Sequence, residues 1–512
     1  MRTTKMAVSA AALALIVVGA TAACSSGGSS TQSTGAPKGG TVTIGGAFGS
    51  LANGWDPDKQ SYGNVEVPFF QAPYATLLTV TDQSKIEPGL AAKWSYTTPL
   101  SFSMTLRPNL KFADGTPLDA AAVKTNIERV IDGSIVGPTT DQLSNVTSVS
   151  TSGLTVTLKL KTPDTSLPLD FTENVGAMVS AKALKDPAAL AVTPSGAGPY
   201  VMEKSATTAG SLWTFVRNKN YYDPKGYSYD TVVFKNITDQ TAAFNALRSG
   251  QVDVTRINSM QLAAAKGAGV TTLNWPSAIN GLWLDDRDGT TNPALKDVRV
   301  RQAINYALDK QAIIKVNGGG TPESSMFWKS SQAYLKSASN KYSYNPSKAK
   351  ALLAAAGYSS GLNISFLSNP FFDNVNQVIV ADLKAVGITA TINDQNAAYI
   401  TDLPKSGIVY YFWFPQGAYY DAKRLLLPNG GFNYLHTTDP KVVSLFNAAA
   451  TAKTTAAATK NWQALNKYVV DQAWFAPIFD DGSQYFASNS KTHVAYNPGN
   501  DWPFLRDITP KS

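Results

Sequence analysis

Short stretches in which apolar and polar residues alternate recur along the chain and predict β-strands. Residues 41–44 end at a glycine pair, and residues 102–106 and 154–160 alternate in the same way. A period of two places successive side chains on opposite faces of a sheet. The first part of the folded chain is therefore predicted to contain several strands, each with one face in a core.

Other segments carry apolar residues at spacings of three and four, which predicts helices with one buried face. One helix follows the capping residue Asp119, a second spans 242–249, and a third follows Asp297. Asn345-Pro346 begins another, because proline fits the first helical turn, and Gly357 ends it. Helices thus alternate with strands along most of the chain.

One strand–helix–strand pattern is especially regular. It comprises a strand at 363–367, a helix at 374–386, a stop at Gly387 and a strand at 388–392. Connections of this kind join parallel strands and place the helix on a face of the sheet. The predicted fold class is mixed α/β.

The first 23 residues have the pattern of a secretory signal peptide. Arg2 and Lys5 precede an apolar run from Ala7 to Ala20, and small residues lead to Cys24, the only cysteine in the 512-residue chain. This arrangement resembles the lipobox of bacterial lipoproteins, which implies cleavage before Cys24 and a lipid on its thiol. We therefore expect the chain to be held by lipidated Cys24 at the outer face of the cell membrane.

Residues 24–39 are rich in Ser, Thr and Gly and are predicted to form a lipidated tether, since they cannot bury a core. Without Arg2 and Lys5, the 44 Lys and Arg become 42 against 36 Asp and Glu, a net charge of +6. The charges are dispersed along the chain, so nucleic acid is not an expected partner. The remaining length exceeds one core, and two or more domains are expected.

Residues for catalysis or metal binding are scarce. The two histidines, His436 and His493, are far apart and have no neighbouring cysteine, whereas a zinc site needs three or four ligands. No nucleophile elbow, phosphate-binding loop or dinucleotide fingerprint is present, and the two Ser-x-x-Lys matches lack their companion motifs. We expect no metal, no cofactor and no enzymatic activity.

Longer motifs run in a fixed order along the chain from about residue 40 to its end. They are Ile86–Ala91 with Trp94, Phe102–Arg107, Lys111–Pro117 with Ala122–Lys124, Gly196–Tyr200, Ala243–Asp253, Asp297–Ile304, Tyr344–Ala349 and Leu383–Ile388. Together they resemble the family 5 extracellular solute-binding proteins, the oligopeptide, dipeptide and nickel binders of bacterial ABC importers.

The resemblance implies a two-lobe fold like that of periplasmic binding proteins (type II, cluster C), with an extra subdomain in lobe one. It places the lobe I core at 40–86, 201–283 and 484–512, the extra subdomain at 87–200, and lobe II at 284–483. The expected partners are ABC permease and ATPase subunits and a small-molecule ligand enclosed between the lobes of a monomer.

Three segments match parts of the family that line the ligand pocket. They supply Tyr62 after Asp56-Pro57, Asn280 and Trp283 from one strand, and Trp413, Phe414, Gln416, Tyr419 and Asp421 from the aromatic segment 410–421. Leu282 and Leu284 suit a core face, which leaves Trp283 for the cleft. The alternative is that both faces of this strand are buried.

The third segment departs from the peptide-binding members. Their Trp-x-x-Asp pattern places an aspartate against the peptide ammonium, whereas Trp413 is followed by Gln416, and Asp421 comes five residues later. A neutral amide cannot neutralise a desolvated ammonium. Aromatic rings with amides favour a neutral ligand, an oligosaccharide ahead of a short peptide. The alternative function is an exported hydrolase, for which Asp285, Asp286 and Asp421 could supply acids.

Overall fold

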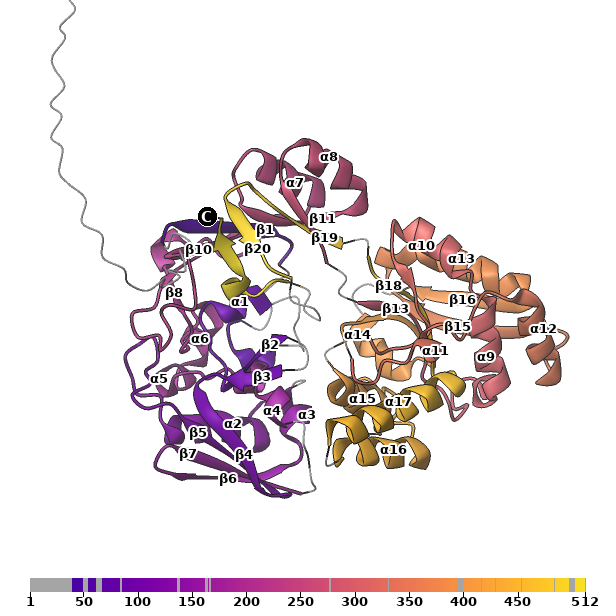
Figure 1. The fold of residues 1–512 in the computed structure, drawn as a ribbon, viewed down its shortest axis with the longest axis horizontal. Coiled ribbons are helices and arrows are strands. Elements are labelled where there is room, and N and C mark those ends of the chain that lie inside the picture. The colour runs from indigo at the N-terminus through magenta and orange to yellow at the C-terminus, as the bar shows by residue number, and fades with distance from the viewer. Residues whose placement is uncertain are drawn as a thin grey trace, which may run out of the picture. The chain divides into compact units, whose positions relative to one another are not determined.

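The computed structural model describes residues 39–48, 54–60, 67–82, 85–135, 139–161, 164, 167–275, 278–329, 331–394, 399–415, 417–428, 430–452, 454–482, 484–496 and 502–511. All of them fall within one unit, Ala36–Ser512. The predicted signal peptide and Cys24 lie outside the described residues. Three sheets of four or more strands organise the rest (Figure 1).

A seven-stranded sheet collects strands from the beginning, the middle and the end of the chain. Its order is β12 (Thr271–Asn274), β19 (Gln484–Ser488), β11 (Val254–Asn258), β1 (Thr41–Gly46), β10 (Thr231–Asn236), β9 (Leu212–Arg217) and β8 (Tyr200–Met202). β1 runs parallel to both β10 and β11, which α7 (Gln240–Arg248) connects. The aromatic core of this sheet includes Phe69, Phe234 and Trp213.

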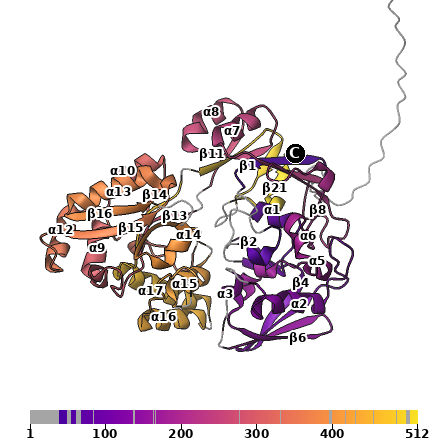
Figure 2. The same cartoon turned by 180° about the vertical axis from the view of Figure 1, so that it is seen from behind.

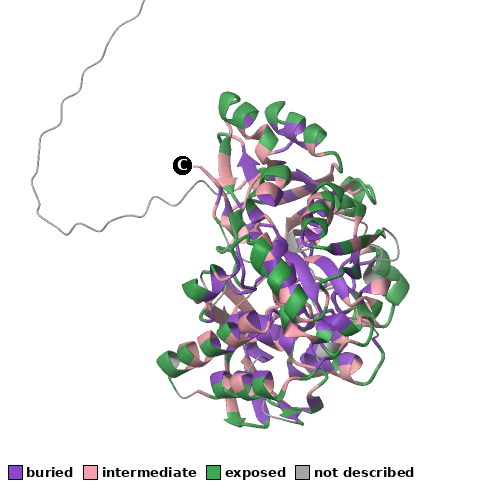
Figure 3. Cartoon of the chain, turned by 90° about the vertical axis from the view of Figure 1, so that its right-hand side faces the viewer, coloured by how far each residue is buried: buried purple, intermediate pink, exposed green. Residues whose placement is uncertain are grey.

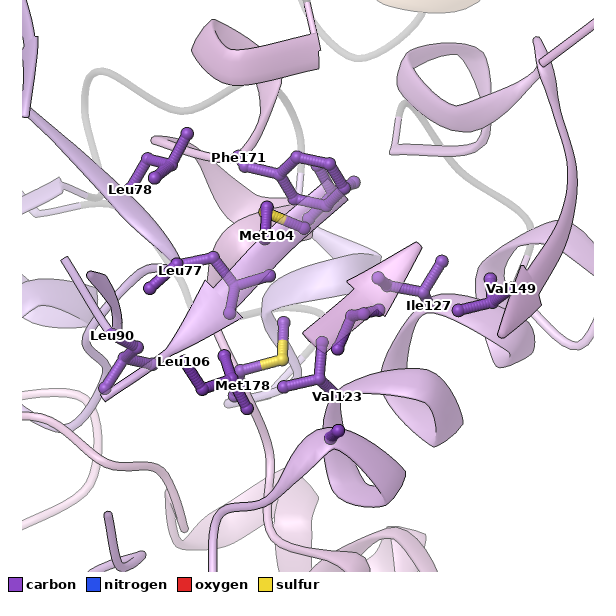
Figure 4. Close-up of a cluster of buried hydrophobic side chains, with 14 of the residues drawn as sticks. Leu77, Leu78, Leu90, Met104, Leu106, Val123, Ile127, Val149, Phe171 and Met178 are labelled. Atoms are coloured by element: carbon purple, nitrogen blue, oxygen red, sulfur yellow. The ribbon is translucent and has the colours of Figure 1, made fainter. Parts of the chain in front are cut away.

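The second sheet is a four-stranded antiparallel one. Its order is β4 (Ala91–Thr98), β5 (Ser101–Leu106), β7 (Thr155–Leu160) and β6 (Val146–Ser152). Helix α2 (Ala120–Ile131) begins where predicted, because Asp119 accepts a 2.9 Å hydrogen bond from the amide of Ala122. Its residues Val123 and Ile127 lie in the same apolar cluster as Met104 of β5 (Figure 4).

A six-stranded mixed sheet occupies most of the later half of the chain. Its order is β14 (Thr321–Pro322), β18 (Phe475–Asp480), β13 (Ile279–Leu284), β17 (Ile408–Trp413), β15 (Leu362–Ser368) and β16 (Ile388–Asp394). One of its two apolar clusters includes α9 (Val298–Ala307), α10 (Lys310–Asn317), α12 (Pro346–Ala355) and α13 (Asp373–Ala385). The other includes α15 (Ala418–Leu426), α16 (Pro440–Ala450) and α17 (Thr455–Asp471). Figures 2 and 3 show these helices and the buried strands between them.

Besides several single-turn 3-10 helices, shorter α-helices and strands are also present. They are α1 (Val67–Gln71), β2 (Leu78–Asp82), β3 (Lys85–Pro88), α3 (Thr139–Leu143), α4 (Leu167–Asp170), α5 (Ala181–Leu184), α6 (Pro187–Val192), α8 (Leu262–Gly267), α11 (Lys336–Ser339), α14 (Tyr399–Asp402), β20 (Thr492–Val494) and β21 (Ile508–Pro510). Within the described ranges, the apolar helices are all too short to traverse a bilayer.

The predicted mixed α/β class is confirmed, and the regular βαβ unit appears as β15, α13 and β16 with the two strands parallel. The predicted helix at 242–249 instead spans Gln240–Arg248, because Asp239 rather than a later residue caps it through the amide of Ala242 at 2.7 Å. β13 belongs wholly to the six-stranded sheet, although the predicted lobe boundary at residue 283 runs through it.

Candidate functional site

Neighbouring strands β13 and β17 bring the second and third predicted pocket segments together. Their antiparallel register sets Trp413 opposite Ile279 and Tyr411 opposite Gly281. Directly opposed residues point to the same face of a sheet, so Trp413 and Tyr411 share a face with Trp283. This is the face covered by α15, α16 and α17.

Five rings on this face form a continuous group, which we call the aromatic wall: Trp283, Tyr411, Trp413, Phe432 and Tyr434. The ring centroid of Trp283 lies 4.6 Å from that of Tyr411 and 6.0 Å from that of Tyr434. The ring of Phe432 meets Trp413 edge to face at 4.9 Å. Tyr411, Phe432 and Tyr434 are half-buried, so part of the wall remains accessible.

The carboxylate of Asp421 holds the Trp413 ring in place. Asp421 lies in α15 with none of its surface exposed, and its Oδ1 accepts a 3.1 Å hydrogen bond from Trp413 Nε1. Its Oδ2 accepts a 3.3 Å bond from the amide of Gly417. Both carboxylate oxygens are therefore engaged inside the protein, and the indole orientation is set by a charge-assisted bond.

Tyr419 does not belong to the aromatic wall, and its side chain contacts another part of the chain. Its ring lies against Phe446 and Trp462, with centroid distances of 5.0 and 6.0 Å. Its hydroxyl donates a 3.0 Å hydrogen bond to Asp164 Oδ1, which precedes α4. Tyr419 thus joins the helix that carries Asp421 to the region of the four-stranded sheet.

The remaining predicted site residues are not assembled with the wall. Phe414 lies against Phe412 at 5.3 Å, and Asn280 is paired with Phe412 in the β13–β17 register, on the sheet face opposite Trp283. The side chain of Asn280 is only 5 % exposed, and its Nδ2 has no hydrogen-bond partner within the part of the chain that the structure describes. Tyr62 and Gln416 lie outside the described residues.

Trp283 is buried at the back of the wall, with only 1 % of its surface exposed. The sheet has an apolar cluster on each face, which was the alternative left open for this residue. Its Nε1 is buried and finds no partner among the described residues. A ligand-binding role for Trp283 remains a prediction.

Three members of the wall, Tyr411, Phe432 and Tyr434, were not among the predicted site residues. Tyr411 could have been found, because it lies two positions before Trp413 on the same strand and therefore shares its face. Phe432 and Tyr434 follow α15 and give no signal of their own in the sequence. Their place depends on how the segment after α15 folds back onto the sheet.

A buried ion pair fixes that segment. Arg287 is 4.1 Å from the centre of the Trp474 ring, and its Nη1 is 3.4 Å from Asp285 Oδ1. Its Nη2 donates a 2.9 Å hydrogen bond to Asn433 Oδ1, between the two aromatic residues of the segment. Burial raises the pKa of Asp285 to about 6, opposed by the charge of Arg287.

No group of three or more His, Cys, Asp or Glu within the described ranges is arranged to hold a metal ion. His436 makes a structural contact, since its Nδ1 lies 2.8 Å from the carbonyl oxygen of Pro428. The chemistry that the aromatic wall itself offers is stacking and hydrogen bonding.

Comparison with known protein families identifies the family of this chain. Residues 85–430 match the model of the bacterial extracellular solute-binding proteins, family 5 Middle. The chain belongs to this family, and the resemblance inferred from the ordered motifs is confirmed.

Two curated relatives illustrate the family. The chain is 28% identical over 313 residues to the glutathione-binding protein GsiB of Salmonella paratyphi A, covering 58% of this chain and 59% of GsiB. It is 25% identical over 395 residues to the nickel-binding periplasmic protein of Escherichia coli, covering 69% of this chain and 72% of that protein. The matched region thus spans well under two thirds of the length of GsiB.

Solved structures share the fold. The binding protein AgaA in complex with agropinic acid, from A. tumefaciens R10, gives a TM-score of 0.79 at 24% identity, covering 92% of this chain and 99% of AgaA. DppA from Helicobacter pylori, in complex with the peptide STSA, gives 0.77 at 18% identity, covering 93% and 99%. The predicted two-lobe α/β fold is confirmed.

Proposed function

We propose that this chain is the substrate-binding lipoprotein of an ABC importer, which captures a neutral solute between its two lobes and delivers it to a membrane permease. The aromatic wall supplies the stacking surface, and the solute is an oligosaccharide or, second, a short peptide without a recognised ammonium. The proposal gives ligand-contacting roles to Tyr62, Asn280, Trp283, Trp413, Phe414, Gln416 and Tyr419, and a positioning role to Asp421.

The main support for a neutral ligand is that the carboxylate of Asp421 is already hydrogen-bonded within the protein. A peptide ammonium removed from water needs a carboxylate partner. Asp421 is fully buried and accepts bonds from Trp413 and Gly417 through its two oxygens. Recruiting it for a ligand would break the bond that orients Trp413. Half-buried rings with hydroxyls, such as Tyr411 and Tyr434, instead favour the apolar faces and hydroxyls of a sugar.

The proposed partners follow from membership of the family. A permease and its ATPase would receive the solute, and the chain would work as a monomer tied by lipidated Cys24 to the outer face of the cell membrane. Two relatives are named for glutathione and nickel, and solved structures with this fold hold agropinic acid or a peptide, so the fold accommodates ligands of different chemistry.

A hydrolytic activity is not part of the proposal. Paired acids across a cleft would be needed. Asp285 is buried against Arg287, and Asp286 accepts hydrogen bonds from the amides of Thr290, Thr291 and Asn292 within its own turn. Asp421 is committed to Trp413. These three carboxylates therefore have structural partners.

Two measurements test the proposal. Mass spectrometry of the purified protein should reveal a copurifying neutral solute. Calorimetric titration should then show saturable binding of members of an uncharged oligosaccharide panel, and peptides with free and acetylated amino termini should bind alike. Tight binding that requires the free ammonium would refute the neutral ligand, and turnover of a bound oligosaccharide would favour the hydrolase.

A further inference from the structure

A group of acidic residues from the four-stranded sheet region faces α15 of the six-stranded sheet. Asp164 precedes α4 and Asp170 is the last residue of that helix; both are buried, and Leu167 of α4 belongs to the core of the four-stranded sheet. Lys423 of α15 places its Nζ 3.3 Å from Asp164 Oδ2 and 3.5 Å from Asp170 Oδ2. Tyr419, one turn earlier in α15, adds its hydroxyl bond to the other oxygen of Asp164.

A second set of contacts lies beside the first. Glu173 Oε2 accepts a 3.2 Å hydrogen bond from the Tyr420 hydroxyl and a 2.7 Å bond from Gln142 Nε2. Arg424 donates to the Tyr420 hydroxyl and lies 4.7 Å from the centre of its ring. The two sets alternate along α15, so one face of this short helix carries four residues that face the acidic group.

These contacts join two parts of the chain whose apolar clusters are distinct, although Leu169 of α4 also packs against the cluster that includes α15. The acidic residues precede their partners by about 250 positions, and the helix that carries the partners packs in the aromatic cluster of the other lobe. Each contact is polar and involves at least one ionisable group. A dry apolar interface would resist reopening, whereas polar groups become hydrated when the surfaces separate.

We propose that Asp164, Asp170 and Glu173, together with Tyr419, Tyr420, Lys423 and Arg424, form a closure latch that sets the ligand affinity of this protein. The inference rests on the proposed function. Ligand binds the closed arrangement, so its apparent affinity scales with the fraction of molecules that are closed. Apart from Tyr419, the latch residues stabilise that arrangement without a proposed contact to the ligand.

The charges make the latch sensitive to pH. The pKa of Glu173 is raised to about 7, chiefly by burial; Arg424 and Lys423 act to lower it, and Asp170 acts to raise it. Gln142 and Tyr420 hydrogen-bond to the same carboxyl. In the proposed latch, closing brings the Tyr420 hydroxyl against Glu173 and withdraws this carboxyl from water, so the closed arrangement would hold the proton more tightly than the open one. Closing is therefore favoured below pH 7 and weakens as the pH rises through about 7.

The test uses Lys423→Met, which keeps the aliphatic stem and removes the charge. The matched control is Lys405→Met, since among the residues that the structure describes Lys405 pairs with Asp402 of its own segment alone, and its side chain is 72% exposed. Small-angle scattering gives the radius of gyration of each purified protein without added solute. Titration gives the dissociation constant for a solute that the wild type binds in the panel.

We expect Lys423→Met to raise the radius of gyration or to weaken binding at least threefold, with Lys405→Met unchanged. Asp164→Asn should weaken binding less in the Lys423→Met background than in the wild type, because the two side chains share one contact. Glu173→Gln should remove the pH dependence near 7. If Lys423→Met has the same radius of gyration and the same dissociation constant as Lys405→Met, the latch proposal is wrong. If the wild type binds no solute, the proposed function fails, while scattering still decides the latch.

Discussion

The indole Nε1 of Trp413 and the carboxylate of Asp421 are joined by a 3.1 Å hydrogen bond inside the second lobe. Trp413 ends β17 and Asp421 lies in the following helix, so the bond sets the angle at which strand and helix meet. The same bond decides which carboxylate a ligand can use. One contact thus links the local fold to the choice of ligand.

Removing the indole N–H should destabilise the protein by leaving a buried carboxylate oxygen short of a donor. Trp413→Phe is expected to lower the free energy of unfolding by about 1–3 kcal/mol more than a loss of ring size alone. Trp213→Phe is the control, because Trp213 is equally buried, at 4%, and has no carboxylate partner in the described part of the chain. Urea unfolding measures both. Equal losses in the two variants would contradict this role for Asp421.

Truncating the ring tests the position of the binding site. Trp413→Ala is expected to weaken the cognate solute more than tenfold, about 1.4 kcal/mol, because stacking area is lost. Tyr434→Leu should weaken it less, since Tyr434 stacks on Trp283 at the partly accessible edge of the wall. Titration calorimetry gives both affinities, with Trp213→Ala as the control for general loss of packing. Unchanged affinity in Trp413→Ala would show that the ligand does not bind at the aromatic wall.

Removing only one partner of the buried Asp285–Arg287 pair should lower the free energy of unfolding. Arg287→Met leaves an uncompensated carboxylate and is expected to lose about 3–5 kcal/mol of stability at pH 8. The double variant Asp285→Asn/Arg287→Met should recover most of that loss, as urea unfolding at fixed pH would show.

The pH dependence of this pair has a definite sign. Burial raises the folded-state pKa of Asp285 from 3.8 to about 6. Folding therefore favours the protonated carboxyl, a contribution that is present below about pH 4 and is lost as the pH rises through about 6. Without Arg287 the pKa rises further, so the loss in Arg287→Met should be smaller at pH 5 than at pH 8. A loss that is independent of pH would exclude ionised Asp285 as its cause.

Gly198, in the Gly196–Tyr200 motif, lies where two segments of backbone approach each other closely. A Cβ at this position would approach the backbone carbon of Pro73 and the amide nitrogen of Tyr74 to 2.4 Å, too close for any side chain. Gly198→Ala should therefore lower the thermal midpoint or prevent folding. Gly267→Ala is the control, because nothing lies within 4 Å of its Cβ and its helix α8 should gain up to about 1 kcal/mol. Thermal unfolding compares them, and a tolerated Gly198→Ala would exclude the close approach.

Local patterns were sufficient for several of the helices and strands and for the mixed α/β class. Asp119, Asp297 and Asn345 each cap a helix where the sequence places it, because capping depends on residues two or three positions away. The parallel β15–α13–β16 unit follows from its periodicity and glycine stop. The ordered motifs also identified the family, since related chains with the same scaffold carry them in the same order.

The site was predicted only in part, because its contacts depend on distant partners. Trp413 and Trp283 do share a face, as the strand periodicity allows, but Phe432 and Tyr434 join them through a segment held by Arg287 and Asn433. The sequence offered Asp421 as an available charge, and only the folded structure shows that its carboxylate is already bonded to Trp413.

The sequence by itself determined the regular strands and helices that it predicts and their caps, since these depend on neighbours a few residues apart, and its ordered motifs determined the family. The tertiary structure alone decided which charges are paired, which rings form the wall, and that Lys423 meets Asp164 across 259 positions. Burial and electrostatic energy depend on the distance between atoms in space, and no local pattern encodes that distance.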